Sequence, residues 1–168
     1  MRMLAASLLC FPLISLADVP TAPNATVLCP SGEPVEAVEG YLTAMQERRF
    51  ADAFEFVTDA MTDGRAKEDW IALQENFFDR GEISIQGLDP KPAVVHGDDS
   101  ACAEVALVPN ILRSRDRFNV SGILEFEVYT VIRDDSAWRI ELQETLYDND
   151  AIRAWFPTVE LIEVSFSE

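Results

Sequence analysis

The apolar residues change their spacing once along this chain of 168 residues, and that change limits the folds open to it. Up to Gly81 they recur at helical intervals, as Val35, Val38, Leu42 and Met45 do on one helix face. After Gly81 apolar and polar residues alternate, which is typical of strands. Helical patterns cover 34–49, 50–61 and 67–79, and strand patterns cover 82–86, 93–96, 101–108, 119–133 and 138–146. This order predicts an α+β fold in which N-terminal helices pack on one face of a curved antiparallel sheet around a single core.

Local signals predict where the helices end. Ser31 has the side chain expected of an N-cap for the first helix. In the third helix, Trp70, Leu73 and Phe77 are expected to face inward. Gly81 is expected to end that helix in the left-handed conformation.

The strand patterns predict a hairpin and two long strands. Residues 93–96 and 101–108 are expected to pair around a turn at 97–100, and residues 110–118 to form a polar connection. In the strand over 119–133, Gly122 indicates a bulge or a bend. The acidic Glu125 and Glu127 are expected on the outer face, as is Glu141 of the next strand. The face expected to point inward in that next strand consists of Trp138, Ile140, Leu142, Glu144 and Leu146.

Two stretches resemble the nuclear transport factor 2-like superfamily, which includes ketosteroid isomerases and is also described as a cystatin-like cone. One is the helix–helix joint over 46–54, and the other is the acidic turn that leads into Trp138, Arg139 and Ile140. The resemblance covers about residues 34–148. It implies a cone-shaped single domain with a pocket between the sheet and the helices, and dimerisation through the sheet. The superfamily contains enzymes and non-catalytic binding domains, so the resemblance bears on fold more than on function.

The first 17 residues have the pattern of a secretory signal peptide. Arg2 gives a positive start, residues 3–16 form an apolar run too short to cross a bilayer, and Ser15 and Ala17 are the small residues of a cleavage site after Ala17. The alternatives are a membrane anchor or a buried N-terminal helix. Cys10 lacks the small preceding residue that lipid attachment needs. We therefore predict export to the periplasm or the extracellular space, with no membrane anchor after cleavage.

The rest of the chain divides into three predicted parts. Residues 18–33 form an extended leader, residues 34–148 form the α+β domain, and residues 149–168 form a C-terminal helix and an apolar tail. The tail is apolar enough to form an edge strand on its own sheet or on the sheet of a second copy. A homodimer through the sheet face or the tail is therefore one prediction.

The charge balance excludes two classes of partner. The chain has 13 Lys and Arg against 30 Asp and Glu, a net charge of −17, and cleavage after Ala17 would remove Arg2 and leave −18. Binding to nucleic acid or to an anionic membrane surface needs a basic surface instead.

Two cysteines, Cys29 and Cys102, would remain after cleavage. In an exported protein the simplest arrangement is one disulfide between them. Closing so long a loop would stabilise the fold by roughly 4 kcal/mol in the chain-entropy model. The alternative is two unpaired thiols.

Four residues are candidates for the pocket that the resemblance implies: Tyr41, Trp70, Thr130 and Glu144. Glu144 stands between Leu142 and Leu146 on an apolar face, so burial would raise its pKa and suit it to general acid or base chemistry. Tyr41 could donate a hydrogen bond to a ligand oxygen. The alternatives are a solvent-exposed Glu144 at a strand end, a Tyr41 at the edge of the core, and a Trp70 that is plain core.

Three arginines, Arg113, Arg115 and Arg117, lie within five positions and are candidates for contact with an anion or a partner. The alternative is charge balance at a hairpin tip in an acidic protein. His96 stands alone beside a turn, so we predict no metal site, and no motif for a cofactor is present.

The sequence leaves three hypotheses open. The first is an exported, non-catalytic domain that binds a small apolar molecule or a protein partner. The second is a small isomerase or lyase with Glu144 as base and Tyr41 as hydrogen-bond donor. The third is an assembly subunit that uses its sheet face and tail.

Overall fold

The computed structural model describes residues 33–96, 104–134 and 137–160, and within them helices pack against an open antiparallel sheet. The N-terminal helical layer consists of α1 (Pro34–Gln46), α2 (Phe50–Ala53), the short 3-10 helix η1 (Phe54–Phe56) and α3 (Lys67–Gly81). The strands are β1 (Ser84–Pro90), β2 (Val94–His96), β3 (Val105–Arg115), β4 (Ile123–Asp134) and β5 (Ala137–Leu146), and they are followed by α4 (Asn149–Trp155). The predicted α+β fold is confirmed.

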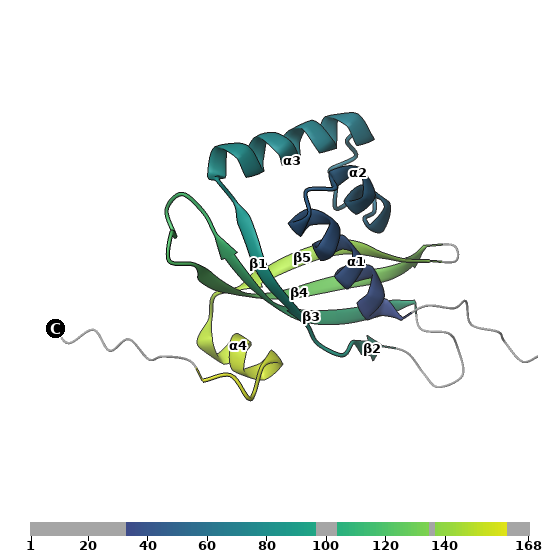
Figure 1. Cartoon of the computed structure of the whole chain (residues 1–168). Coiled ribbons are helices and arrows are strands. Elements are labelled where there is room, and N and C mark those ends of the chain that lie inside the picture. Colours follow the sequence, from purple (N-terminus) through teal and green to yellow (C-terminus); the bar gives the residue numbers. More distant parts are fainter. Residues whose placement is uncertain (1–32, 97–103, 135–136, 161–168) are drawn as a thin grey trace, which may run out of the picture.

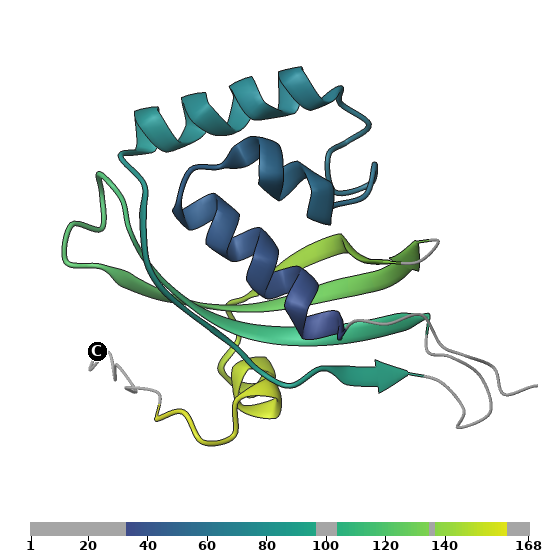
Figure 2. The ribbon, with the colours of Figure 1, turned by 45° about the vertical axis from the view of Figure 1, so that its right-hand side comes forward.

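The sheet has the order β1-β3-β4-β5, and β2 also pairs with β3. The helical layer covers one face of the curved sheet, which we call the inner face (Figures 1 and 2). The other face, the outer face, carries α4. The predicted hairpin over 93–108 is confirmed where the structure describes it, because Val94 pairs with Leu107 and His96 with Val105.

The helix ends differ from the predicted ones. The N-cap of α1 is Glu33, whose backbone N–H donates to Glu36 Oε2 at 3.2 Å, so the prediction of Ser31 is wrong. The left-handed residue after α3 is Glu82, with φ of 52°, and Gly81 is the last helical residue. Glycine is favoured at this position but not required.

The inward face of α3 is also shifted from the predicted one. Trp70 and Phe78 are buried, whereas Leu73 and Phe77 are exposed. The buried stripe therefore runs through Gln74, one helical turn from each of the two buried aromatics. Because Gln74 is polar, the apolar pattern of the sequence did not indicate this stripe.

Residues 110–118 do not form the predicted polar connection, because β3 continues to Arg115. Asn110 and Ser114 are buried in this strand, and each donates a side-chain hydrogen bond to a glutamate of β4. The turn lies further along the chain, where Asp116 Oδ1 accepts from the backbone N–H of Phe118 at 2.6 Å. Gly122, with φ of 89°, belongs to this loop and not to a bulge within β4.

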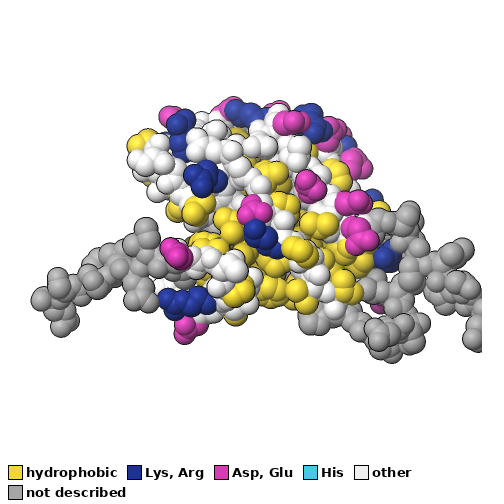
Figure 3. Space-filling model, turned by 60° about the horizontal axis from the view of Figure 1, so that its bottom comes forward, with side chains coloured by type: hydrophobic (Ala, Val, Ile, Leu, Met, Phe, Trp, Pro, Cys, Tyr) yellow, Lys and Arg dark blue, Asp and Glu magenta, His cyan; other side chains and the backbone are white. Residues whose placement is uncertain are grey.

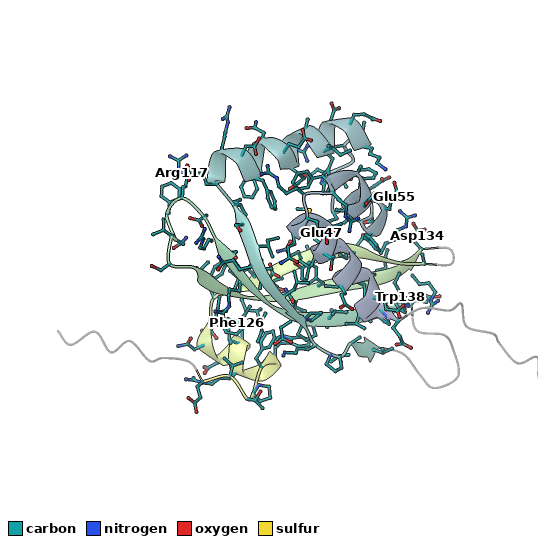
Figure 4. The ribbon with its side chains drawn as sticks, in the orientation of Figure 1. Glu47, Glu55, Arg117, Phe126, Asp134 and Trp138 are labelled. Atoms are coloured by element: carbon teal, nitrogen blue, oxygen red, sulfur yellow. The ribbon has the colours of Figure 1, made fainter. Side chains whose placement is uncertain are left out.

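Residues on the two faces of β4 belong to two different hydrophobic clusters. Tyr129 and Val131 pack into the main core with α1, whereas Phe126 packs against Ile152 and Phe156 around α4. Figure 4 shows Phe126 on the side of the sheet that faces α4, and Figure 3 shows hydrophobic side chains gathered on the centre of that outer face. Apolar and polar residues alternate along β4 as predicted. The predicted orientation is wrong, because Glu125 and Glu127 point toward the helices.

A bulge in β5 reverses the alternation of that strand. Thr130 of β4 pairs with Leu142, but Val131 pairs with Ile140, so Glu141 is the extra residue. The backbone N–H of Thr58 donates to the oxygen of Ile140 at 3.0 Å beside this bulge. Ile140 is therefore in the core, whereas Leu142 is 54% exposed on the outer face.

Several predictions fall outside the described residues. They concern the signal peptide over 1–17, the leader up to residue 32, Cys29, Cys102 and the tail from residue 161. Among the helices that the structure describes, none is long and apolar enough to cross a membrane.

Candidate functional site

A cavity of about 420 Å³ lies between the helical layer and the inner face of the sheet. Residues of α1 and α3 line one side, and inward-facing residues of β1, β3, β4 and β5 line the other. Most lining side chains are apolar or aromatic: Tyr41, Leu42, Met45, Met61, Trp70, Phe77, Phe78, Ile83, Ile85, Leu112 and Tyr129. Phe77 is 61% exposed, so the C-terminal part of α3 lies at the mouth.

The polar centre of the cavity is Glu127 of β4, which is only 2% exposed. Its Oε2 accepts hydrogen bonds from Asn110 Nδ2 at 2.8 Å and from the Tyr129 hydroxyl at 2.9 Å. Its Oε1 accepts one from Gln143 Nε2 at 2.7 Å. Three strands thus hold one carboxyl group in a fixed orientation.

Burial raises the pKa of the Glu127 carboxyl, because the apolar surroundings disfavour its charged form. The hydrogen bonds from Asn110, Tyr129 and Gln143 act in the opposite direction, and the nearby Glu125 carboxylate adds to the rise. The net direction is upward. A carboxyl group with a raised pKa in a cavity is a marker of functional sites.

Two tyrosines flank this carboxyl group, and both keep their protons at neutral pH. The rings of Tyr41 and Tyr129 meet edge to face, with centroids 6.3 Å apart. Burial raises the pKa of both hydroxyls, and the proximity of Glu127 raises each pKa further. Tyr41 is 6% exposed, and its hydroxyl forms no hydrogen bond with any residue that the structure describes. That hydroxyl is therefore available to a ligand.

A second carboxyl group, Glu125, lies two residues earlier on the same face of β4 and accepts a hydrogen bond from Ser114 Oγ at 2.7 Å. Arg115 and Asp116, at the end of β3, complete the lining. Hydrogen bonds from Asn119 and Phe118 lower the pKa of the Asp116 carboxyl, so it is ionised at neutral pH. Among the described lining residues, the charged groups are therefore three carboxyl groups and one guanidinium.

The structure places only two of the four predicted pocket residues in the cavity. Tyr41 and Trp70 line it. The predicted position of Glu144 is wrong, because the bulge at Glu141 turns it to the outer face, where it is exposed. Thr130 lies on that outer face as well, between Tyr129 and Val131 of the inner face. Glu144 therefore does not line the cavity and cannot act there as a base.

Glu127 and Gln143 are site residues that the sequence pattern did not predict. Glu127 was assigned to the outer face because the alternate residues of β4 are more apolar than its own set. A polar series of Asn110, Ser114, Glu125, Glu127 and Gln143 does exist in the three strands. It becomes a signal only when the register of β3, β4 and β5 is known.

The three predicted arginines do not form one site. Arg115 lines the cavity, whereas Arg113 lines a separate small depression with Gln86. Arg117, labelled in Figure 4, donates to the backbone oxygen of Arg80 at 3.1 Å and lies over the ring of Phe118. Within the described part of the chain, no group of three metal-binding side chains occurs.

Comparison with known proteins places the chain beside several solved structures. No family model and no curated protein matches the sequence. A protein of unknown function with a cystatin-like fold from Nostoc punctiforme is 13% identical, with a TM-score of 0.49, over 70% of this chain and 90% of the other. A ketosteroid isomerase-like protein from Erwinia carotovora atroseptica is 16% identical, with a TM-score of 0.46, over 67% and 93%.

Bdellovibrio bacteriovorus Bd1075 is also similar, at 12% identity and a TM-score of 0.47. The match covers 66% of this chain and 39% of the length of that one.

Proposed function

We propose that this protein binds a small, mainly apolar molecule in the cavity between its helices and its sheet. The observation that carries the proposal is Glu127, a buried carboxyl group fixed by three donors inside an aromatic cavity. A polar group of this kind in an apolar pocket orients a ligand. Oε1 of Glu127 accepts one hydrogen bond from the protein, so it can accept another from a ligand.

A dye that fluoresces in apolar sites, N-phenylnaphthylamine, tests this proposal. We expect saturable binding by the wild-type protein. The variant Ile85→Trp places a large side chain in the cavity lining from β1 and should abolish it. Leu142→Trp adds the same side chain on the outer face and should leave binding unchanged. Circular dichroism establishes that both variants fold. Equal dye binding by the two variants would contradict the proposal.

A second candidate function is proton transfer, with Glu127 as the base. The raised pKa of its carboxyl favours this candidate, because a base with a pKa closer to neutrality transfers protons more effectively. In such a reaction Glu127 would take a proton from a carbon next to a ligand carbonyl and return it, while the Tyr41 hydroxyl would donate to the carbonyl oxygen. Exchange of the α-protons of tetralone with deuterated water would reveal this activity. Loss of that exchange in Glu127→Gln is the expected result for an enzyme.

We also propose that the chain is exported and cleaved after Ala17. The short positive start and the apolar run support this proposal. Expression of the whole sequence in a bacterial host, followed by mass spectrometry of the exported protein, should show a chain that begins at Asp18. The same spectrum with and without reduction tests the proposed disulfide between Cys29 and Cys102. A full-length protein retained in the cytoplasm would contradict export.

The proposed homodimer has a simple test of its own. Light scattering measures the mass of the protein in solution, and removal of residues 161–168 tests whether the tail contributes. A monomer at high concentration would exclude pairing through either the tail or the sheet face.

A further inference from the structure

The lining of the cavity carries an excess of negative charge. Glu127, Glu125 and Asp116 contribute three carboxyl groups, whereas Arg115 is the one guanidinium among the described lining residues. The whole chain adds to this field, with a net charge of −17. Such a field draws cations toward the cavity and repels anions.

The deepest of these carboxyl groups has no positive partner within the protein. The groups that donate to Glu127 are two amides and one hydroxyl, all of which are neutral. No ion pair in the described part of the chain includes Glu127 or Glu125. Neutral donors satisfy the hydrogen-bonding capacity of a carboxylate in part, but they do not supply the countercharge that offsets its burial.

The walls of the cavity suit a cation that is also apolar. The rings of Trp70, Phe77, Phe78 and the two tyrosines line it, and aromatic faces attract ammonium groups. The hydroxyl of Tyr41 has no partner among the described residues and can accept a hydrogen bond from an N–H group. Among the described residues, no group of three His, Cys, Asp or Glu side chains is placed so that it could hold a metal ion.

We propose that the ligand of this cavity is a small organic cation, an amine whose ammonium group hydrogen-bonds to Glu127 and whose aromatic or alicyclic part packs against the rings. The inference rests on the proposed ligand-binding function and specifies its ligand class. Glu125, on the same face, supplies a second negative charge near the ammonium group. A neutral alcohol of the same shape lacks the charge that the site is built to offset.

Three naphthalene probes of matched shape test this inference: naphthylmethylamine, naphthylmethanol and naphthoate. Their affinities are measured by titration calorimetry at neutral pH, or by displacement of N-phenylnaphthylamine. We expect the amine to bind about tenfold or more tightly than the alcohol, since a charge-assisted hydrogen bond in a buried site has that effect. The carboxylate should bind most weakly of the three.

The two faces of the sheet supply matched variants. Glu127→Gln removes one negative charge inside the cavity and should abolish the preference for the amine over the alcohol. Glu144→Gln removes one charge on the outer face and should retain the preference. Glu125→Gln, a second cavity variant, should reduce the preference by a few-fold. The Glu125 variant replaces the Glu127 variant in this test if the latter does not fold. The comparison of the three probes on the wild-type protein needs no variant.

Each outcome decides between the two proposals. If the alcohol binds as tightly as the amine, the cavity binds ligands but the inference about charge is wrong. If Glu144→Gln loses the preference as Glu127→Gln does, the net charge of the chain determines selectivity and the inference is again wrong. If neither the three probes nor the dye bind, the ligand-binding function itself is overturned.

Discussion

The inner and outer faces of β4 differ in the kind of residue that each buries. The inner face buries Glu127 and Tyr129 around a cavity, whereas the outer face buries Phe126 against Phe156 with ring centroids 5.3 Å apart. Polar residues on the inner face are held by hydrogen bonds between strands, whereas Phe126 on the outer face packs against Ile152 of α4 and Phe156. The more apolar face of a strand is therefore not always the one that faces the main core.

The largest expected effect on stability concerns Ile140 and Leu142, which the bulge in β5 places on opposite faces of the sheet. Ile140→Ala should lower the free energy of unfolding by about 2–5 kcal/mol, because it leaves a cavity in the core. Leu142→Ala, on the other side of the bulge and exposed, should change it by less than about 0.5 kcal/mol. Urea denaturation measures both values. Equal losses would show that the bulge does not separate the two residues.

The next effect concerns the hydrogen bonds to Glu127. Tyr129→Phe removes one donor from a buried carboxylate and should cost about 1.5–3 kcal/mol of unfolding free energy at neutral pH. Thr130→Val removes a hydroxyl from the outer face at the next position and should cost less than about 0.5 kcal/mol. The comparison fails if the Thr130 variant loses more stability than the Tyr129 variant.

The raised pKa of Glu127 predicts how stability depends on pH. At low pH the carboxyl group is protonated in both the folded and the unfolded chain. As pH rises past 4.5, the ordinary value, the unfolded chain releases its proton first, so the folded state loses stability until pH exceeds the raised pKa. The loss amounts to about 1.4 kcal/mol for each unit by which folding raises the pKa.

Urea denaturation over a pH series, compared with Glu127→Gln, measures this loss. Glu125, Tyr41 and Tyr129 face Glu127 and remain in both proteins, so the difference between the two curves isolates Glu127. That difference should fall with rising pH. A difference that rises instead would mean that folding lowers the pKa of Glu127.

The smallest effect concerns the helix that covers the outer face. Asp148 Oδ1 caps α4 by accepting from the backbone N–H groups of Asp150 at 2.9 Å and Ala151 at 3.0 Å. Asp148→Ala should cost about 1 kcal/mol, whereas Asp148→Asn should retain most of the stability. Hydrogen exchange of the α4 amides should show the loss locally. Equal exchange in wild type and Asp148→Ala would mean that the cap does not hold the helix.

The sequence predicted the layers of the fold more successfully than the site. The order of helices and strands follows from hydrophobic periodicity, which reflects burial along each element. The placement of Tyr41 and Trp70 in the cavity lining followed from the helix patterns and the resemblance. Glu144 was misplaced because a single inserted residue, Glu141, reverses the faces of β5, and nothing in the local sequence marks that bulge.

Glu127 was missed for a different reason. Its burial depends on Asn110 and Gln143, which lie on other strands and become partners only through the sheet register. The packing of Phe126 against α4 likewise depends on the tertiary fold, in which the more apolar set of β4 points away from the helical layer. Periodicity shows which residues share a face but not which face is which.

The most direct test of this account is the titration of the Glu127 carboxyl group by carbon-detected NMR, with the resonance assigned by its loss in Glu127→Gln. We expect a pKa above the ordinary value of 4.5 in the free protein, and a fall in that pKa when naphthylmethylamine is added. A pKa at or below 4.5 that does not respond to the amine would contradict a buried carboxyl group inside a ligand-binding cavity.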